Sequence, residues 1–202
     1  IEPSTSDAPA ARWEVIMDAD TPSGQGADSG AEPPRGASGD AAAVHAEAAD
    51  QPAQQPGPRT GIVVGHDGSA YADRALEVTL DLADGLGVPV TIVRAWTIDT
   101  APRPANWEFG YVSSYADYAD AVTQKLTRDT REALGRHPQL TVEFRVVMSG
   151  PAKALIEVSR GSRMLVVGSR GRGGLAGMLL GSVSEQCVRH ADCPVLVVPP
   201  RV

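Results

Sequence analysis

The amino-acid sequence predicts an α/β fold, in which an open five-stranded parallel sheet carries helices on both faces. Three observations support this prediction. From Gly61 onward, short apolar runs of strand length alternate with amphipathic stretches of helix length, in the order βαβαβαβαβ. Helical connections of this kind join parallel strands, because the chain must cross the sheet before it starts the next strand. A glycine-rich loop follows the fourth apolar run, at the end of the strands where such sheets bind ligands.

The first strand, helix and second strand follow from local signals. The apolar run 62–64 predicts a central strand that is buried on both faces. Ser69 is a good N-cap for the next helix, whose apolar residues recur at helical spacing, and Gly85 and Gly87 mark its end. Residues 90–96 predict the second strand.

The remaining elements follow a proline-broken loop at 97–110. The next stretch predicts a long helix, and the residues spaced along one of its sides are Val112, Tyr115, Ala119, Val122 and Leu126. Pro151 suits the first turn of the third helix. The other predicted elements are a third strand at 140–148, a fourth at 164–167, a helix at 182–191 and a fifth strand at 194–198.

Residues 1–60 differ from the rest of the chain in composition. They carry ten acidic residues, three arginines and eight prolines but no leucine, so they hold the whole formal net charge of −7. A segment with so little apolar surface cannot offset the entropy of ordering its backbone. We therefore expect residues 1–60 to be a disordered acidic tail and linker, and residues 61–202 to form one domain.

One apolar stretch interrupts this tail, at residues 12–17 (Arg-Trp-Glu-Val-Ile-Met). It is interpreted first as a chance apolar patch, or as the remnant of a lost upstream strand. The alternative is a docking motif that pairs with the edge of a sheet.

Composition also bears on partners and compartment. No basic patch suggests nucleic-acid binding. No apolar run approaches the roughly 18 to 20 residues of a membrane span, and no signal-peptide pattern is present. Cys187 and Cys193 lack the spacing and neighbours of a metal site, which favours free thiols and no metal ligation. We therefore expect a cytoplasmic protein without a membrane or nucleic-acid partner.

The strongest functional signal is the pattern Gly168-x2-Gly171-x9-Gly181-Ser182 after the fourth strand. Glycines let backbone N–H groups approach an anion, and a helix N-terminus adds unpaired donors and the positive end of a dipole. This arrangement predicts a phosphate site. The alternative is a surface loop, with Ser182 and Glu185 forming a capping box that needs no ligand.

This pattern resembles the ATP-binding signature of the universal stress protein family, and the resemblance covers residues 61–202. It implies an adenine nucleotide alpha hydrolase-like fold with strand order 3-2-1-4-5. It also implies that Gly168, Gly171, Gly181 and Ser182 hold the triphosphate of ATP. Arg170, inside the loop, can reach phosphate oxygens, although solvated arginines are common in such loops.

A second group of residues, His66-Asp67-Gly68-Ser69, follows the first strand. A carboxylate here can bind ribose hydroxyls or hold a phosphate-bound Mg²⁺ through water, or it can simply cap the helix. The family resemblance implies that Asp67 contacts the nucleoside and that the backbone of Ala95 recognises the adenine. His66 is interpreted as ending the strand rather than as a ligand residue.

Three functions remain open at this point. The first is an ATP-binding protein whose nucleotide state regulates a response to stress or dormancy. The second is a slow ATPase or autophosphorylating enzyme, although no catalytic residue can be assigned because no general base is positioned. The third is a nucleotide-free dimeric interaction module. The chain contains no GxGxxG after the first strand and no GxxxxGK[ST], so dinucleotide-fold and P-loop enzymes are excluded.

The fifth strand, 194–198, is apolar and carries no charge that would keep its edge from pairing. The family resemblance implies dimerisation through this strand. We therefore expect a homodimer across residues 194–198, and an unidentified protein client fits the same class of function.

Overall fold

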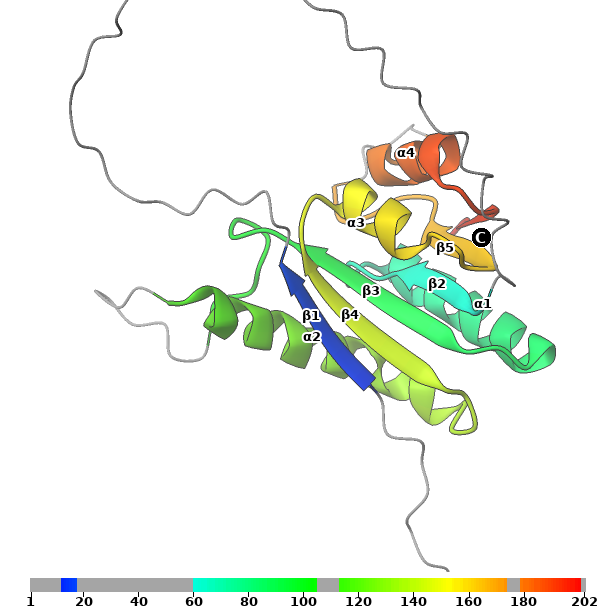
Figure 1. Cartoon of the computed structure of the whole chain (residues 1–202), viewed down its shortest axis with the longest axis horizontal. Helices are drawn as coiled ribbons and strands as arrows, with labels where there is room; N and C mark the ends of the chain where they lie inside the picture. Colours follow the sequence, from blue (N-terminus) through cyan, green and yellow to red (C-terminus); the bar gives the residue numbers. More distant parts are fainter. Residues whose placement is uncertain (1–11, 18–59, 105–112, 174–178, 201–202) are drawn as a thin grey trace, which may run out of the picture.

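The computed structural model describes residues 12–17, 60–104, 113–173 and 179–200, which form one parallel sheet with helices on both faces (Figure 1). The strands are β1 (Arg12–Met17), β2 (Ile62–Gly65), β3 (Val90–Trp96), β4 (Val142–Met148), β5 (Met164–Gly168) and β6 (Val195–Val198). The helices are α1 (Ala70–Leu86), α2 (Tyr115–Gly135), α3 (Pro151–Val158) and α4 (Ser182–His190). The predicted α/β fold class is confirmed.

The sheet has the order β1-β4-β3-β2-β5-β6, and every pair of neighbours is parallel. From β2 to β6 this is the expected order 3-2-1-4-5. The addition is β1, which pairs along its whole length with β4 and carries an ion pair of 3.3 Å from Glu14 to Arg145. The interpretation of residues 12–17 as a chance patch was therefore wrong, and the alternative of pairing with a sheet edge is the one observed. Apart from residues 12–17 and Thr60, the expected disordered tail lies outside the described residues.

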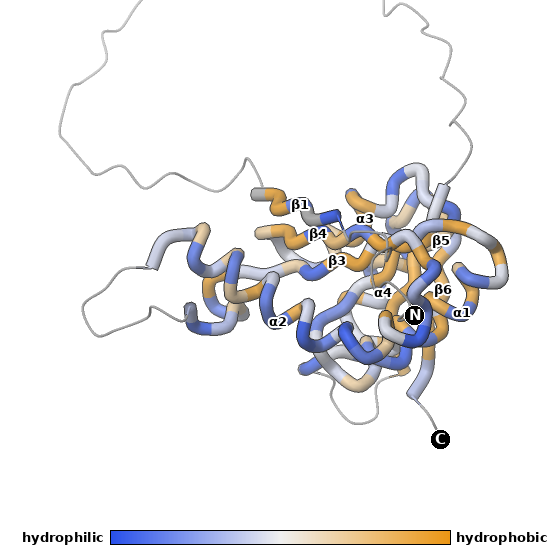
Figure 2. The backbone as a smooth tube through the Cα atoms, turned by 90° about the horizontal axis from the view of Figure 1, so that it is seen from below, coloured by the Kyte–Doolittle hydropathy of each residue, from blue (hydrophilic) through white to orange (hydrophobic). Residues whose placement is uncertain are grey.

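Helices α1 and α2 cover one face of the sheet, and α3 and α4 cover the other (Figure 1). Alternate residues of each central strand point to opposite faces. Val64 and Ile92 therefore pack in the core on the α1/α2 side, whereas Val63 and Val93 pack in the core on the α3/α4 side. Because both faces are covered, the central strands β2 and β5 are hydrophobic on both sides rather than alternating, whereas β3 also contains Thr91 and the buried Arg94 (Figure 2).

The helix boundaries confirm some local signals and correct others. Ser69 caps α1, where its hydroxyl accepts a hydrogen bond from the Ala72 amide at 3.3 Å, and Gly87 ends the helix at a φ of 62°. Gly85 lies inside α1 and does not end it. Tyr115 was expected on the inner side of α2 but is 47% exposed, and Val112 lies outside the described residues. None of the described helices is long and apolar enough to cross a membrane.

The winding of the sheet reverses between β2 and β5, which are direct neighbours. From β2 the chain proceeds through β3 to β4 on one side, and from β5 it proceeds to β6 on the other. Right-handed crossovers in opposite directions carry the chain to opposite faces, which opens a crevice at the carboxyl ends of these two strands. The loops after β2 and β5 border this crevice.

The carboxyl end of β5 packs against the first turn of α1, and Gly168 makes this approach possible. A Cβ atom at Gly168 would lie 2.8 Å from the backbone oxygen of Tyr71. Backbone cannot move aside as a flexible side chain can. Gly168 therefore has a structural role in bringing the two loops of the crevice together.

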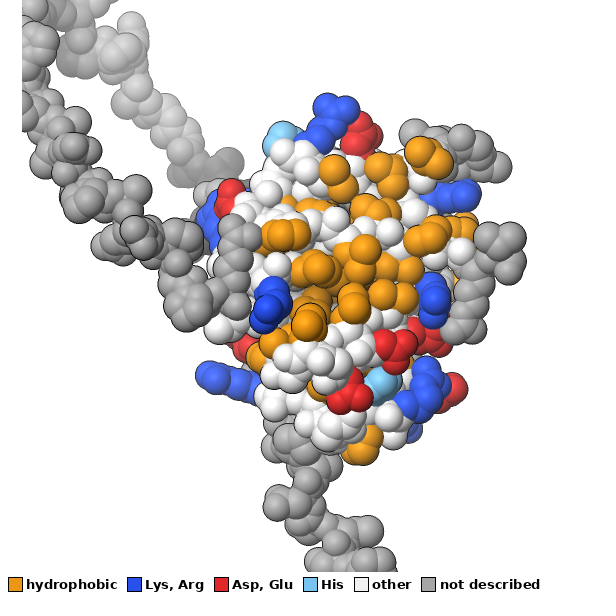
Figure 3. All heavy atoms as spheres, turned by 90° about the vertical axis from the view of Figure 1, so that its right-hand side faces the viewer, with side chains coloured by type: hydrophobic (Ala, Val, Ile, Leu, Met, Phe, Trp, Pro, Cys, Tyr) orange, Lys and Arg blue, Asp and Glu red, His pale blue; other side chains and the backbone are white. Residues whose placement is uncertain are grey.

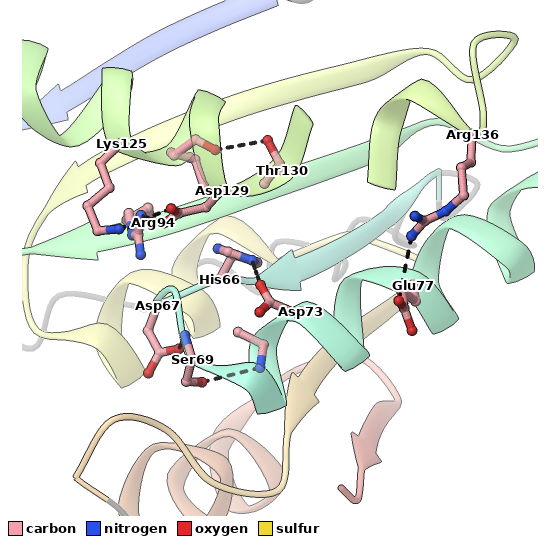
Figure 4. A network of polar contacts seen from close by, with 12 residues as sticks. His66, Asp67, Ser69, Asp73, Glu77, Arg94, Lys125, Asp129, Thr130 and Arg136 are labelled. Carbon is pink, nitrogen blue, oxygen red and sulfur yellow. Dashed lines mark hydrogen bonds and ion pairs between the residues drawn. The ribbon is translucent and has the colours of Figure 1, made fainter. Parts of the chain in front are cut away.

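The end of β2 is also fastened to α1 by a buried polar contact. His66 is 2% exposed, and its Nε2 lies 3.0 Å from an oxygen of Asp73 (Figure 4). Burial, and then the nearby positive charge of Arg94, lower the pKa of His66 below its usual value and outweigh the opposing effect of Asp73. His66 directly follows β2, as the sequence analysis interpreted it, and it also lines the cavity at this end of the sheet.

We expect Gly168→Ala to lower the free energy of unfolding by about 1–3 kcal/mol, because the added methyl group would overlap the Tyr71 carbonyl. The measurement is chemical denaturation of the full chain. Gly135→Ala is the matched control, since a Cβ at Gly135 would meet no atom within 4 Å. Equal stability of the two variants would contradict the packing role of Gly168.

We expect His66 to make the folded chain less stable as the pH falls below about 6.5. In the unfolded chain His66 gains a proton near that pH, whereas in the folded chain its lowered pKa delays protonation to a lower pH, so the unfolded state binds more protons. The stability that His66 contributes is therefore present above this pH and lost below it, with a slope of at most about 1.4 kcal/mol per pH unit. Denaturation between pH 5 and 8 should show a shallower dependence for His66→Gln. The exposed control His190→Gln should behave as the unsubstituted chain, and identical profiles for all three would disprove the assignment.

Candidate functional site

A cavity of about 430 Å³ lies at the crevice, at the carboxyl ends of the central strands. Every site residue predicted from the sequence lines it, namely Asp67, Ala95, Gly168, Arg170, Gly171, Gly181 and Ser182. The fold thus gathers residues that lie more than a hundred positions apart in the chain. Val93, Leu155 and Val167 form an apolar part of the cavity lining, and residues 170–173 and 181–182 form a polar part.

Asp67 connects the two loops of the crevice. One carboxylate oxygen accepts a hydrogen bond from the Ser69 amide at 3.0 Å, and the other accepts one from the Arg172 amide at 3.0 Å. Burial raises the pKa of Asp67, but the hydrogen bonds from Ser69 and Arg172 outweigh it and hold the pKa below its usual value. Asp67 is therefore ionised at neutral pH.

Gly171 lies directly against this carboxylate. A Cβ atom at Gly171 would lie 2.6 Å from an oxygen of Asp67. A side chain here would displace Asp67 from the Arg172 amide. Glycine at this position thus lets the loop close over Asp67 without displacing its carboxylate.

The N-terminus of α4 opens on the cavity without a side-chain cap. Gly181 is the N-cap, and the first helical hydrogen bond runs from the Glu185 amide to the Gly181 carbonyl at 2.9 Å. The capping box that the sequence analysis considered as the alternative does not form, because Ser182 is the first helical residue and the Glu185 carboxylate pairs with Arg189 at 2.6 Å. The N–H groups of residues 182–184 precede the hydrogen-bonded part of the helix.

Helix α3 adds a second N-terminus to the same cavity. Its N-cap is Gly150, which has no side chain to cap with, and Pro151 follows and lines the cavity. By contrast, α1 and α2 are capped by the hydroxyl groups of Ser69 and Ser114. Both helices without side-chain caps border the cavity, as does the first turn of α1 at Ala72, and the positive ends of the α3 and α4 dipoles favour an anion there.

Ser184 anchors the glycine-rich loop, although the sequence analysis did not single it out. Its hydroxyl donates to the Gly168 carbonyl at 2.7 Å, and the Gly181 amide donates to the Ser169 carbonyl at 2.7 Å. The sequence does contain a signal for this role. Ser184 is a small polar residue on the buried face of the predicted helix 182–191, and a buried hydroxyl group needs a hydrogen-bond partner. These bonds place Gly181 and the start of α4 beside the end of β5.

Arg170 packs against α1. Its guanidinium lies 5.4 Å from the ring centroid of Tyr71, at a distance typical of a cation–π contact. Its Nε is buried and has no hydrogen-bond partner among the described residues. The aromatic ring therefore positions this cation at the cavity wall.

The backbone N–H and C=O of Ala95 face the cavity, as the hydrogen bonds between β2 and β3 indicate. The carbonyl of Val93 accepts a hydrogen bond from the His66 amide at 2.9 Å, so the peptide groups of Val93 face β2. Strand alternation turns the N–H and C=O of Ala95 to the same side, and β2 has already ended there. The carbonyl of Trp96 faces the other way, where it accepts from the Ser149 amide.

The described residues contain no group of three or more His, Cys, Asp or Glu side chains that could hold a metal ion. Cys187 and Cys193 are free thiols in the core on the α3/α4 side. Burial, and then the neighbouring Cys193, raise the pKa of Cys187 to about 11. These thiols pack in the core and take no part in the cavity.

Comparisons with known proteins agree with this architecture. The family model of the universal stress protein family matches residues 58–199. The chain is 35% identical over 149 residues to universal stress protein Rv2005c of Mycobacterium tuberculosis, which covers 71% of this chain and 49% of the relative. It is 33% identical over 156 residues to universal stress protein MT2698 of the same species, covering 76% of this chain and 49% of that one. The chain thus spans about half the length of the curated relatives it matches.

Solved structures share the fold. A universal stress protein in complex with cAMP superposes with a TM-score of 0.52 at 29% identity, covering 70% of this chain and 97% of that one. The universal stress protein UspA from Lactobacillus plantarum gives a TM-score of 0.54 at 15% identity, with 69% and 97% covered. Since the family model matches residues 58–199, which is most of the chain, this protein belongs to the universal stress protein family.

Proposed function

We propose that this chain binds ATP in the cavity of about 430 Å³, and that its nucleotide state regulates a partner in a response to stress or dormancy. One observation carries the proposal. The cavity is lined both by apolar side chains, which form an apolar slot, and by a polar end that includes the glycine-rich loop, and the N-termini of two helices without side-chain caps border it. A ligand that combines a flat, weakly polar ring with a chain of negative charge matches both parts.

The adenine occupies the apolar slot in this proposal. Val93, Leu155 and Val167 supply its walls. The N–H and C=O of Ala95, which face the space beyond β2, offer a donor and an acceptor to the edge of the base. The relative that is described in complex with cAMP supports an adenine nucleotide as the ligand class.

The phosphates occupy the polar end. Gly171 and Gly181 keep the loop free of side chains, and the amides at the start of α4 supply donors, with the Ser182 hydroxyl beside them. Arg170 contributes a positive charge at the wall. Asp67, ionised and held between the loops, is positioned for the ribose hydroxyls.

A Mg²⁺ ion fits this site only as a companion of the phosphates. Asp67 is the one carboxylate among the described residues that line the cavity, and both of its oxygens already accept backbone hydrogen bonds. Phosphate oxygens and water would supply most ligands of the ion, as is usual for Mg²⁺.

We also propose that the protein is located in the cytoplasm, because both thiols are unpaired, as expected in a reducing compartment.

We further propose that the chain forms a homodimer through β6. This strand lies at the edge of the sheet and carries only Val and Leu side chains. Hydrophobic side chains gather across the face on this side of the molecule (Figure 3), and Val188 of α4 is 51% exposed. An unprotected apolar edge of this kind is usually covered by another strand or chain.

Nucleotide binding is tested on the purified full chain. We expect denaturation to release an adenine nucleotide that mass spectrometry identifies, and calorimetry to show ATP binding. Gly171→Val should weaken ATP binding at least tenfold, because its Cβ would lie 2.6 Å from the Asp67 carboxylate and push the loop open.

The control for this substitution is Gly85→Val, at a position in α1 where a Cβ would meet no atom within 4 Å. It should leave ATP binding unchanged. Circular dichroism checks that both variants fold. If folded Gly171→Val binds ATP as tightly as the unsubstituted chain, the assignment of the phosphate site is wrong.

The dimer is tested by analytical ultracentrifugation at micromolar concentrations. We expect Val197→Lys in β6 to shift the chain toward monomer, because a charged side chain would lie in an apolar interface. Val15→Lys places the same charge on β1, at the opposite edge of the sheet, and should leave the dimer intact. A monomeric unsubstituted chain, or equal loss of dimer in both variants, would rule out the β6 interface.

A further inference from the structure

A second cavity, of about 240 Å³, lies on the α2 side of the same sheet end. The end of β3, the loop that follows it and α2 enclose it, and it shares Asp67, Ala95 and Arg172 with the first cavity. Its other polar wall is formed by Arg94 and Lys125, and its apolar wall by Trp96, Pro102 and Val122. The nucleotide proposal leaves this cavity unassigned.

Two buried donors in this wall lack a partner. Arg94 is 5% exposed and Trp96 is 2% exposed, and strand alternation directs both side chains to the same side of β3. Among the described residues, neither the Nη2 of Arg94 nor the Nε1 of Trp96 has a hydrogen-bond partner. Both groups can only donate, and leaving a buried donor unpaired costs free energy. A ligand with hydrogen-bond acceptors would therefore pair both of these buried donors.

The charges of the cavity also favour an anion. A single carboxylate, Asp129, serves two cations: it accepts from Nη1 of Arg94 at 2.9 Å and from Nζ of Lys125 at 3.0 Å (Figure 4). Burial raises the pKa of Asp129, but the hydrogen bonds from Lys125 and Arg94 outweigh it, so this carboxylate is ionised. On the opposite wall, Asp67 accepts a hydrogen bond from the backbone amide of Arg172. With two carboxylates against three cations, the cavity carries one positive charge in excess.

We propose that the second cavity is a binding site for a phosphate group, held by Arg94, Lys125 and Arg172 with the indole N–H of Trp96 as a further donor. Arginine and lysine are the side chains that bind phosphate oxygens best, and the phosphate supplies the acceptors that the two buried donors lack. A metal cation or a basic ligand is disfavoured by the excess positive charge. The inference does not depend on nucleotide binding in the first cavity.

The phosphate group has two possible sources, free inorganic phosphate and the phosphate chain of a nucleotide that reaches past the shared residues. The test follows the indole N–H resonance of Trp96 in the ¹⁵N-labelled full chain, which Trp96→Phe identifies. Inorganic phosphate and ATP are titrated separately against chloride at constant ionic strength. We expect a saturable shift of this resonance with at least one of the two.

Two substitutions on α2 provide the matched comparison. Lys125→Gln should weaken the phosphate affinity by roughly tenfold, because it removes a charge-assisted hydrogen bond. Arg128→Gln removes the same charge from an exposed position of the same helix and should leave the affinity unchanged.

The separate titrations distinguish the two sources. A saturable shift caused by inorganic phosphate supports a separate phosphate site, and a shift caused by ATP alone supports a nucleotide as the source. The proposal is overturned if neither ligand gives a saturable shift, if chloride gives the same shift, or if Lys125→Gln binds as tightly as Arg128→Gln. Failure of ATP to bind the first cavity would leave the inorganic phosphate result standing.

Discussion

The direct pairing of β2 with β5 is the constraint on which the rest of the site depends. Because the winding of the sheet reverses between these strands, the loops that follow them leave toward opposite faces and border a crevice. Asp67 then closes part of this opening by accepting one hydrogen bond from its own turn and one from the loop after β5. A charged acceptor makes these bonds stronger than bonds between neutral groups.

The two faces of the sheet provide positive charge by different means. On the α3/α4 side it comes from backbone amides at two helix N-termini, which carry no side chain and leave room for a ligand. On the α1/α2 side it comes from Arg94 and Lys125, which share the carboxylate of Asp129. Amides hold their position without losing side-chain entropy, whereas a buried guanidinium needs partners to offset its desolvation. Asp67 and Arg172 line both cavities.

The two edges of the sheet differ as well. At one edge, β1 covers β4 through six paired residues, and the ion pair between Glu14 and Arg145 adds charge there. At the other edge, β6 has only apolar side chains. Charge on an edge strand discourages further pairing, whereas an apolar edge invites it. The sheet is therefore asymmetric in how readily each edge can meet another chain.

Much of the fold could be read from local patterns. Apolar runs identified β2 to β6, and Ser69 and Pro151 marked helix starts, because these signals act over a few residues. The family resemblance, rather than the pattern itself, supplied the strand order. The pattern of residues 12–17 could not show that they form β1. A short apolar stretch becomes a strand only where the edge of a sheet is available to pair with it, and here that edge is β4.

The same limit applies to the site. By itself the sequence identified the glycine-rich loop that lines the first cavity, since glycines and a hydroxyl residue between a strand and a helix mark a phosphate loop wherever the strand lies, whereas the roles of Asp67 and Ala95 came from the family resemblance. Only the tertiary structure decided that Gly168 serves packing against Tyr71, that no capping box forms at Ser182, and that Arg94 and Trp96 share a cavity with α2. Those outcomes depend on which atoms from distant parts of the chain come into contact, and spacing along the sequence carries no information about such contacts.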